Sequence, residues 1–266
     1  MSPAARRSWL FALFWLAFVG GALLEYLLPP ADAGLAGALT HEAAARMLYA
    51  AAALALGGLA AVLPRERHCL TPLSIGAIMA AFLVALNNFP IATLLVHRTA
   101  TVTAPKEAVL AFLLACLGTA LFEELLFRGF LLPLCLARTG RTRRGRFAAV
   151  LLSSAVFGAF HLPNLLAGAD PGATLLQVGY SFLVGCVAAV LCLLTGGLLL
   201  PVLFHLVYNV GGYLVPRLGT GPLYDTPTVF VTVFLSLACA ILVFLALWQE
   251  KTPHTGGKNT QKTKKI

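Results

Sequence analysis

The chain has 266 residues, of which 59% are hydrophobic and only 11% are charged, and its formal net charge is +9. Soluble domains usually carry about 25% charged and about 45–50% apolar residues, so this composition indicates a protein whose solvent is lipid. Because a transmembrane helix takes about 20 apolar residues, the chain has room for roughly eight such helices and none for a separate soluble domain.

Eight apolar runs follow one another along the chain, separated by Pro, Gly and charged residues. They cover about residues 8–28, 43–63, 72–96, 108–134, 147–167, 174–195, 198–216 and 228–248. The first run is longer than a signal-peptide core of about 7–15 residues, so we expect an uncleaved helix. The fold class predicted is all-α: a polytopic membrane protein of about eight transmembrane helices. Residues 1–250 form its single domain, with a motif core at 108–216, and 251–266 form a disordered lysine-rich tail.

The basic residues are distributed unevenly over the loops between these runs. Fourteen of them fall on one side of an alternating eight-helix arrangement: Arg6, Arg7, Arg65, Arg67, Arg138, Arg141, Arg143, Arg144, Arg146, Lys251, Lys258, Lys262, Lys264 and Lys265. Only Arg98, Lys106 and Arg217 fall on the other. Cytoplasmic loops of membrane proteins are enriched in Lys and Arg, which predicts a multi-pass cell-membrane protein with both termini cytoplasmic. The expected partner of this charge is the lipid bilayer, not nucleic acid.

The cysteines do not indicate disulfides or a metal site. None of the six forms a C-x-x-C pair, and five lie inside apolar runs. We interpret them as small apolar packing residues.

The fourth run contains three ionisable residues, Glu123, Glu124 and Arg128. Ionisable groups within a membrane are costly, so each is a functional candidate. Glu124 and Arg128 are four residues apart and can pair on one helix face, whereas Glu123 points about 100° away from Glu124. The run is also too long for a simple span, and we expect a kink near Gly129 and Pro133.

Two later runs add His161, His205 and Asn209. From the run ends, Glu123 lies roughly 17 Å deep, His161 roughly 21 Å and His205 roughly 11 Å, at about 1.5 Å per residue. All three therefore lie inside the bilayer at compatible depths. A carboxylate and two imidazoles in a shielded cavity suit proton transfer and water activation, and Asn209 with one histidine could hold an oxyanion.

Each of these polar residues, taken alone, has a structural explanation. A single polar residue in a membrane helix commonly makes a packing hydrogen bond. We interpret Asn87 and Asn88, next to Pro90, as a helix break, and the pair of Glu124 with Arg128 could also be purely structural. A proton-coupled transporter, or a non-catalytic immunity or scaffold protein, are the alternative functions. Five candidates on three helices at compatible depths are, however, not expected to occur together by accident.

The three motifs together resemble those of the CPBP family, which comprises CAAX prenyl endopeptidases and bacteriocin-processing or immunity relatives. E-E-x-x-x-R stands here at Glu123 to Arg128, F-x-x-x-H at Phe157 to His161, and H-x-x-x-N at His205 to Asn209. The resemblance implies an intramembrane endopeptidase acting on a peptide or membrane-protein substrate. It implies that Glu123 is the catalytic glutamate and His161 its partner in activating water. His205 and Asn209 would bind metal or the oxyanion, with Glu124, Arg128 and Phe157 in support.

The sequence leaves a metal cofactor open. Zinc or another divalent metal could be held by Glu123, His161 and His205, since a catalytic zinc usually takes three protein ligands. There is no H-E-x-x-H motif, however, and the neutral oxygen of Asn209 makes it a poor zinc ligand. Its amide is a good donor to an oxyanion. We therefore favour a site without a cofactor.

Overall fold

The computed structural model describes residues 34–57, 70–166 and 168–249. Within these residues the regular structure is helical except for two strands of two residues each. Five of the described helical segments are long and apolar enough to cross a membrane, and a shorter apolar helix accompanies them. This confirms an all-α polytopic membrane protein. The predicted first run and the lysine-rich tail lie outside the described residues.

The helices are α2 (Gly34–Gly57), α3 (Pro72–Asn87), α4 (Lys106–Glu124), α5 (Leu132–Thr139), α6 (Arg143–Ala159), α7 (Pro171–Thr195), α8 (Leu199–Leu218) and α9 (Thr226–Gln249). Side chains cap the N-terminal ends of α6 and α7, two of the helices that form the site. Thr142 accepts a hydrogen bond from the Gly145 N–H at the start of α6, and Asp170 accepts one from Ala173 at the start of α7. These bonds satisfy N–H groups that a helix leaves unpaired. At the other end of α7, Gly196 takes up a left-handed conformation with a φ of 70° and so stops the helix.

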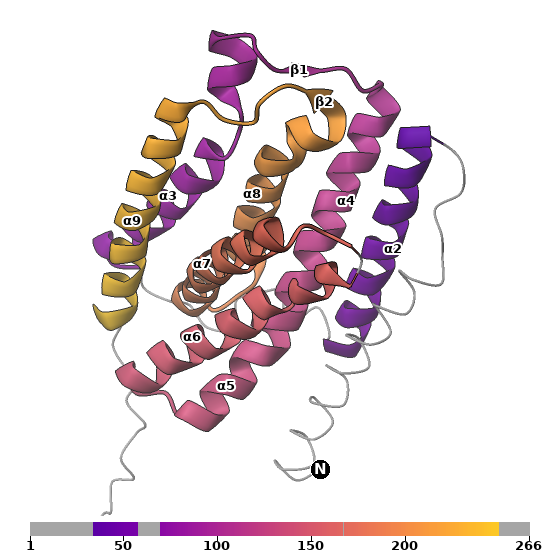
Figure 1. Ribbon diagram of the computed structural model, residues 1–266. Helices are drawn as coiled ribbons and strands as arrows, with labels where there is room; N and C mark the ends of the chain where they lie inside the picture. Colours follow the sequence, from indigo (N-terminus) through magenta and orange to yellow (C-terminus); the bar gives the residue numbers. More distant parts are fainter. Residues whose placement is uncertain (1–33, 58–69, 167, 250–266) are drawn as a thin grey trace, which may run out of the picture.

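Helix α8 is at the centre of the bundle (Figure 1). It packs against α4 on one side, against α3 on another and against α7, which crosses it. Helix α2 covers the outer side of α4, α9 lies along α3, and α6 packs on α7. The arrangement encloses one space between α4, the end of α6, α7 and α8.

The outer surface of α9 is strongly apolar. Phe230 and Phe234 are each 71% exposed, and Leu237 and Ile241 are each 61% exposed. In water such a patch would be unfavourable, but hydrocarbon is as apolar as these side chains. The surface of this helix therefore fits a membrane environment.

Two of the predicted runs differ from the helices in their bounds. Helix α2 begins at Gly34 and not at residue 43. The predicted apolar run starts after the polar residues near position 42, but the helix includes them. One of them, Glu42, forms an ion pair with Arg217 of α8. The third run, 72–96, is not one helix. The helix α3 ends at Asn87, and helical structure resumes as a short π-helical turn, η2, at Ala92–Val96.

The break agrees with the interpretation of the two asparagines as packing residues. Asn88 is buried and donates from Nδ2 to the Tyr208 carbonyl oxygen at 2.6 Å, and Asn87 donates to the Thr232 hydroxyl at 2.7 Å. Pro90, which lacks an N–H, prevents the helix from continuing. The asparagines thus tie α3 to α8 and α9.

The two ends of the bundle differ in charge. The strand β1 (Thr101–Val102) pairs antiparallel with β2 (Gly219–Thr220) at one end, close in sequence to the few basic residues of that side. The α5–α6 junction and the end of α9 lie at the opposite end (Figure 1). There the Arg143 guanidinium is 6.0 Å from the centre of the Trp248 ring. The arginine-rich loop and the end of α9 therefore lie on the same side, as the alternating arrangement predicts.

Candidate active site

The first motif lies where a long helical segment widens. Residues 106–139 form one apolar stretch, but a π-helical turn, η3 (Leu125–Leu131), separates α4 from α5. The Leu132 N–H bonds to the carbonyl of Phe127, five residues back. Pro133 has no N–H, and its ring would conflict with a carbonyl four residues earlier in a regular α-helix. The expected irregularity near Gly129 and Pro133 is thus a widened turn, a feature frequent at functional sites.

Glu124 is fully buried and is the centre of the polar network. Its Oε1 accepts a hydrogen bond from Arg128 Nη1 at 2.9 Å and another from His205 Nδ1 at 2.8 Å. Arg128 also donates from Nη2 to the Gly185 carbonyl at 3.0 Å and lies 4.5 Å from the centre of the Phe157 ring. The predicted pairing of Glu124 with Arg128 is present, and the other contacts offset part of the cost of burying both charges, while Glu124 Oε2 is buried without a hydrogen-bond partner.

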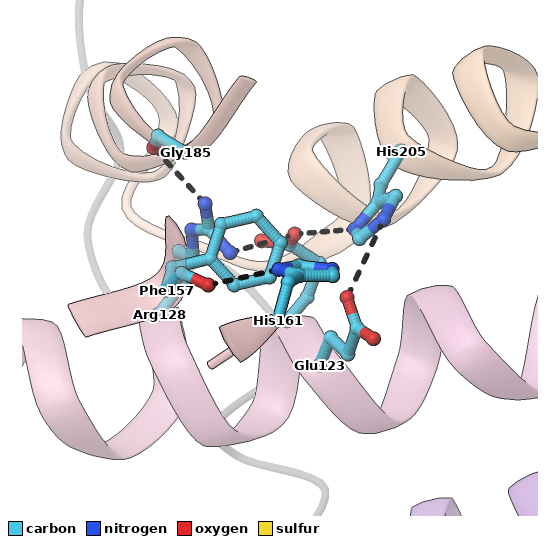
Figure 2. Close-up of polar contacts among 7 residues, drawn as sticks. Glu123, Arg128, Phe157, His161, Gly185 and His205 are labelled. Carbon is cyan, nitrogen blue, oxygen red and sulfur yellow. Dashed lines mark hydrogen bonds and ion pairs between the residues drawn. The ribbon is translucent and has the colours of Figure 1, made fainter. Parts of the chain in front are cut away.

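His205 bridges the two adjacent glutamates (Figure 2). A carboxylate can only accept, so His205 Nδ1 carries the proton that it shares with Glu124. The other ring nitrogen, Nε2, lies 3.7 Å from Glu123 Oε2. His205 is buried, and Glu123 is only 7% exposed. This contact between the first and third motifs was not predicted from the sequence, which assigned Glu124 only to Arg128.

His161 lies just beyond a helix and not within one, which corrects the placement on a membrane helix. Helix α6 ends at Ala159, and His161 precedes a 3₁₀ turn, η4 (Leu162–Leu165), whose second residue is Pro163. Pro163 has no N–H to bond to the Ala159 carbonyl four residues earlier, which accounts for the early end. The His161 Nδ1 is 3.2 Å from the Phe157 carbonyl oxygen. That nitrogen therefore carries the proton, and Nε2 keeps its lone pair.

Glu123 and His161 do not form an ion pair with each other within the part of the chain that the structure describes. The ring of His161 nevertheless extends from the end of α6 toward Glu123 (Figure 2). Both residues line the same cavity.

The cavity brings together residues from all three motifs. Its walls are formed by Thr119, Glu123, Phe157, His161, Gln177, Tyr180, Ser181, Val184, His205, Tyr208, Asn209 and Tyr213. The polar residues contributed by α7 were missed by sequence reasoning. The only signal for them was the spacing of Gln177, Tyr180 and Ser181 at three and four residues in an otherwise apolar run, which places them on one helix face.

Close contact between α6 and α7 sets the position of the second motif. A Cβ on Gly158 would lie 2.8 Å from the Val178 carbonyl oxygen of α7. A Cβ on Gly185 would lie 3.1 Å from the Phe157 ring and 3.3 Å from Arg128 Nη2. The two glycines therefore allow the helices to approach until Phe157 can cover the arginine.

The three-ligand zinc site considered from the sequence would use Glu123, His161 and His205. Among the described residues, no three His, Cys, Asp or Glu side chains are grouped so that they could hold a metal ion. His205 and His161 both use Nδ1 for protein partners, which leaves Nε2 as the one ligand atom of each ring.

The bundle of apolar helices is that of a polytopic membrane protein. Its cavity, lined by a carboxylate and two imidazoles, has the groups that a hydrolytic centre needs. Residues 105–211, which contain all three motifs, match the Rce1-like family. The description of this family is type II CAAX prenyl endopeptidase Rce1-like. This match covers less than half of the chain and supports a relation to the CPBP/CAAX proteases over that segment. No curated protein and no solved structure matches it at a significant level.

Proposed function

We propose that the chain is an intramembrane endopeptidase that hydrolyses a peptide bond of a membrane-associated protein or peptide by means of an activated water. One observation carries the proposal. Glu123, His161, His205 and Asn209 come from three separate segments and line one cavity among apolar helices. The match of residues 105–211 to a protease family supports a peptide or protein as the substrate.

Glu123 and His161 activate the water in the proposed mechanism. The water lies between the Glu123 carboxylate and His161 Nε2, and both of these groups accept its hydrogens. As the water oxygen forms a bond to the scissile carbonyl carbon, its proton passes to Glu123. The hydrogen bond from His161 Nδ1 to Phe157 keeps the imidazole oriented.

His205 and Asn209 stabilise the oxyanion that results. The Asn209 amide donates through Nδ2, and His205 donates through Nε2, so in this role its ring carries a proton on both nitrogens. Glu124 and Arg128 position His205. When the intermediate collapses, the C–N bond breaks and Glu123 returns its proton to the leaving amine. Water has then been added across the peptide bond and every side chain is restored.

The charge distribution supports an orientation in the cell membrane with the arginine-rich end in the cytoplasm. Arg138, Arg141, Arg143 and Arg144 are exposed at the α5–α6 junction. Anionic headgroups and the enrichment of basic residues in cytoplasmic loops favour this side. Both termini are cytoplasmic in the resulting arrangement.

Replacement of Glu123 by Gln tests the proposal. Purified wild type in detergent is incubated with a panel of quenched fluorescent peptides, half of them ending in a farnesylated CAAX sequence and half unmodified. We expect cleavage by wild type and a loss of about 10²- to 10⁴-fold in Glu123→Gln. Glu107→Gln is the matched control, because Glu107 is an exposed carboxylate in the first turn of the same helix.

The same variant separates the alternative functions. Cleavage that persists at the wild-type rate in Glu123→Gln contradicts the proposed mechanism. Absence of cleavage together with ion flux that depends on Glu123 in liposomes indicates a transporter. A cellular phenotype that survives the substitution indicates a non-catalytic scaffold or immunity protein.

A further inference from the structure

Gln177 is a cavity residue to which the proposed mechanism assigns no role. It lies on α7, opposite the motif residues of α4 and α8, and lines the same cavity as Glu123 and His161. Its Oε1 accepts a hydrogen bond from Asn164 Nδ2 at 2.9 Å. Asn164 belongs to the η4 turn that follows His161 and is not part of the cavity wall.

Asn164 is held in place by its own backbone. Its N–H donates to the His161 carbonyl oxygen at 3.1 Å, and its carbonyl accepts from the Ala169 N–H at 3.0 Å. The side chain of Asn164 therefore offers its amide nitrogen from a fixed turn. Because a carboxamide has one oxygen and one nitrogen on the same carbon, this bond determines which end of Gln177 is used. The acceptor is engaged outside the cavity, and the two N–H donors remain for the cavity.

A peptide that enters a cavity within the membrane loses the water that hydrated its backbone. Each buried carbonyl without a donor carries a substantial desolvation penalty, so the walls must supply donors. Glu123 only accepts, and His161 Nε2 acts as an acceptor in the proposed mechanism. Asn209 and His205 are committed to the scissile carbonyl. The wall hydroxyls, such as those of Tyr180 and Ser181, can donate or accept, whereas the bond from Asn164 orients Gln177 so that its N–H donors are available.

We propose that Gln177 binds the substrate by donating a hydrogen bond from Nε2 to a main-chain carbonyl next to the scissile bond. The inference rests on the proposed function, because it takes a peptide as the ligand of the cavity. A main-chain contact accepts many side chains, so it positions the peptide without selecting its sequence. Asn164 acts through Gln177 and is a positioning residue.

Three variants separate a donor to the substrate from a simple clamp between η4 and α7. Gln177→Glu keeps an oxygen for Asn164 but has no N–H to donate. Gln177→Met removes both functions without adding charge. Asn164→Ala removes the clamp and leaves the Gln177 donors. The matched control is Asn87→Leu, which breaks a similar side-chain bond, to Thr232, between α3 and α9.

The readout is binding, measured on the Glu123→Gln background so that the peptide is not consumed. Fluorescence anisotropy gives Kd for a fluorescein-labelled farnesylated CAAX peptide and for its unmodified counterpart. We expect both Gln177 variants to raise the Kd of the bound peptide by roughly 3- to 10-fold, the usual effect of one lost hydrogen bond. Asn164→Ala should raise it less, and Asn87→Leu should leave it unchanged.

The pattern of binding decides the inference separately from catalysis. Wild-type affinity in Gln177→Glu, together with weakened binding in Asn164→Ala, shows a clamp only and overturns the inference. Wild-type affinity in all three variants overturns it as well. If the peptide binds in a Gln177-dependent way but otherwise unaltered protein does not cleave it, the inference stands and the proposed function fails. If the wild type cleaves the peptide but the Kd does not depend on Gln177, the inference fails and the proposed function stands.

Discussion

His205 donates a hydrogen bond from Nδ1 to Glu124 Oε1 at 2.8 Å, joining α8 to the end of α4. The bond fixes both the tautomer and the orientation of the ring, so that Nε2 is the nitrogen near Glu123. The glutamate that touches neither the cavity nor solvent thus controls a residue that does line the cavity. The two adjacent carboxylates have different tasks because they face different directions on the helix.

Removing Arg128 should destabilise the protein. Arg128→Ala leaves Glu124 as a buried carboxylate with one fewer compensating donor, and breaking a buried pair costs about 3–5 kcal/mol. We expect a lower Tm and a smaller monodisperse fraction in detergent. Arg138→Ala, which removes an exposed arginine of the same helical stretch, should leave both unchanged. An unaltered Tm in Arg128→Ala would show that the network does not stabilise the fold.

The motif residues should behave as one catalytic unit. Glu123→Ala, His161→Ala and His205→Ala should each abolish cleavage while the protein still inserts and accumulates. Residues that act on one step have non-additive effects, so the double variant Glu123→Ala/His161→Ala should be little worse than either single variant. Multiplicative losses in kcat/KM would indicate that the two residues serve separate steps.

The close crossing of α6 and α7 should be sensitive to one methyl group. In Gly158→Ala the new Cβ would meet the Val178 carbonyl at 2.8 Å, and such overpacking costs about 1–3 kcal/mol. The helices must separate, which moves His161, so both Tm and kcat should fall. Gly179→Ala is the control on α7, where a Cβ meets nothing within 4 Å. Equal behaviour of the two variants would contradict the close crossing.

Reporter fusions test the orientation. Fusions at Gly140, in the arginine-rich loop, and at Thr255, in the tail, should both give a cytoplasmic signal. The physical reason is the excess of basic residues on this side. Opposite signals at the two sites would refute an even number of spans between them, and two non-cytoplasmic signals would reverse the orientation.

Metal analysis tests the choice of a cofactor-free mechanism. Purified active protein should contain well under one equivalent of zinc, cobalt or manganese, and chelator treatment should leave most of the activity. The reason is that the proposed roles of His205 and Asn209 are those of donors, whereas a metal needs their lone pairs. A stoichiometric metal whose removal stops turnover and whose return restores it would make the protein a metalloprotease.

Much of the architecture was predictable because the solvent imposes it. Lipid requires helices of about 20 apolar residues, so composition alone predicted an all-α membrane protein, and punctuation by Pro and Gly predicted most helix ends. The spacing of Glu124 and Arg128 predicted their pair, since residues four apart are neighbours on any α-helix. The high cost of ionisable groups in lipid identified Glu123, His161 and His205 as candidates.

The tertiary structure decided what one-dimensional spacing does not contain. Helical periodicity relates residues within an element, but it gives no rotation of one helix about another. Only packing placed His205 between the two glutamates and turned Gln177 of α7 into the cavity. The close approach at Gly158 and the carbonyl of Gly185 are likewise backbone contacts between helices, which no side-chain pattern specifies. The sequence by itself identified the ionisable side chains that lie within apolar runs, where burial carries a high free-energy cost. The tertiary structure decided which atoms of these side chains face one another.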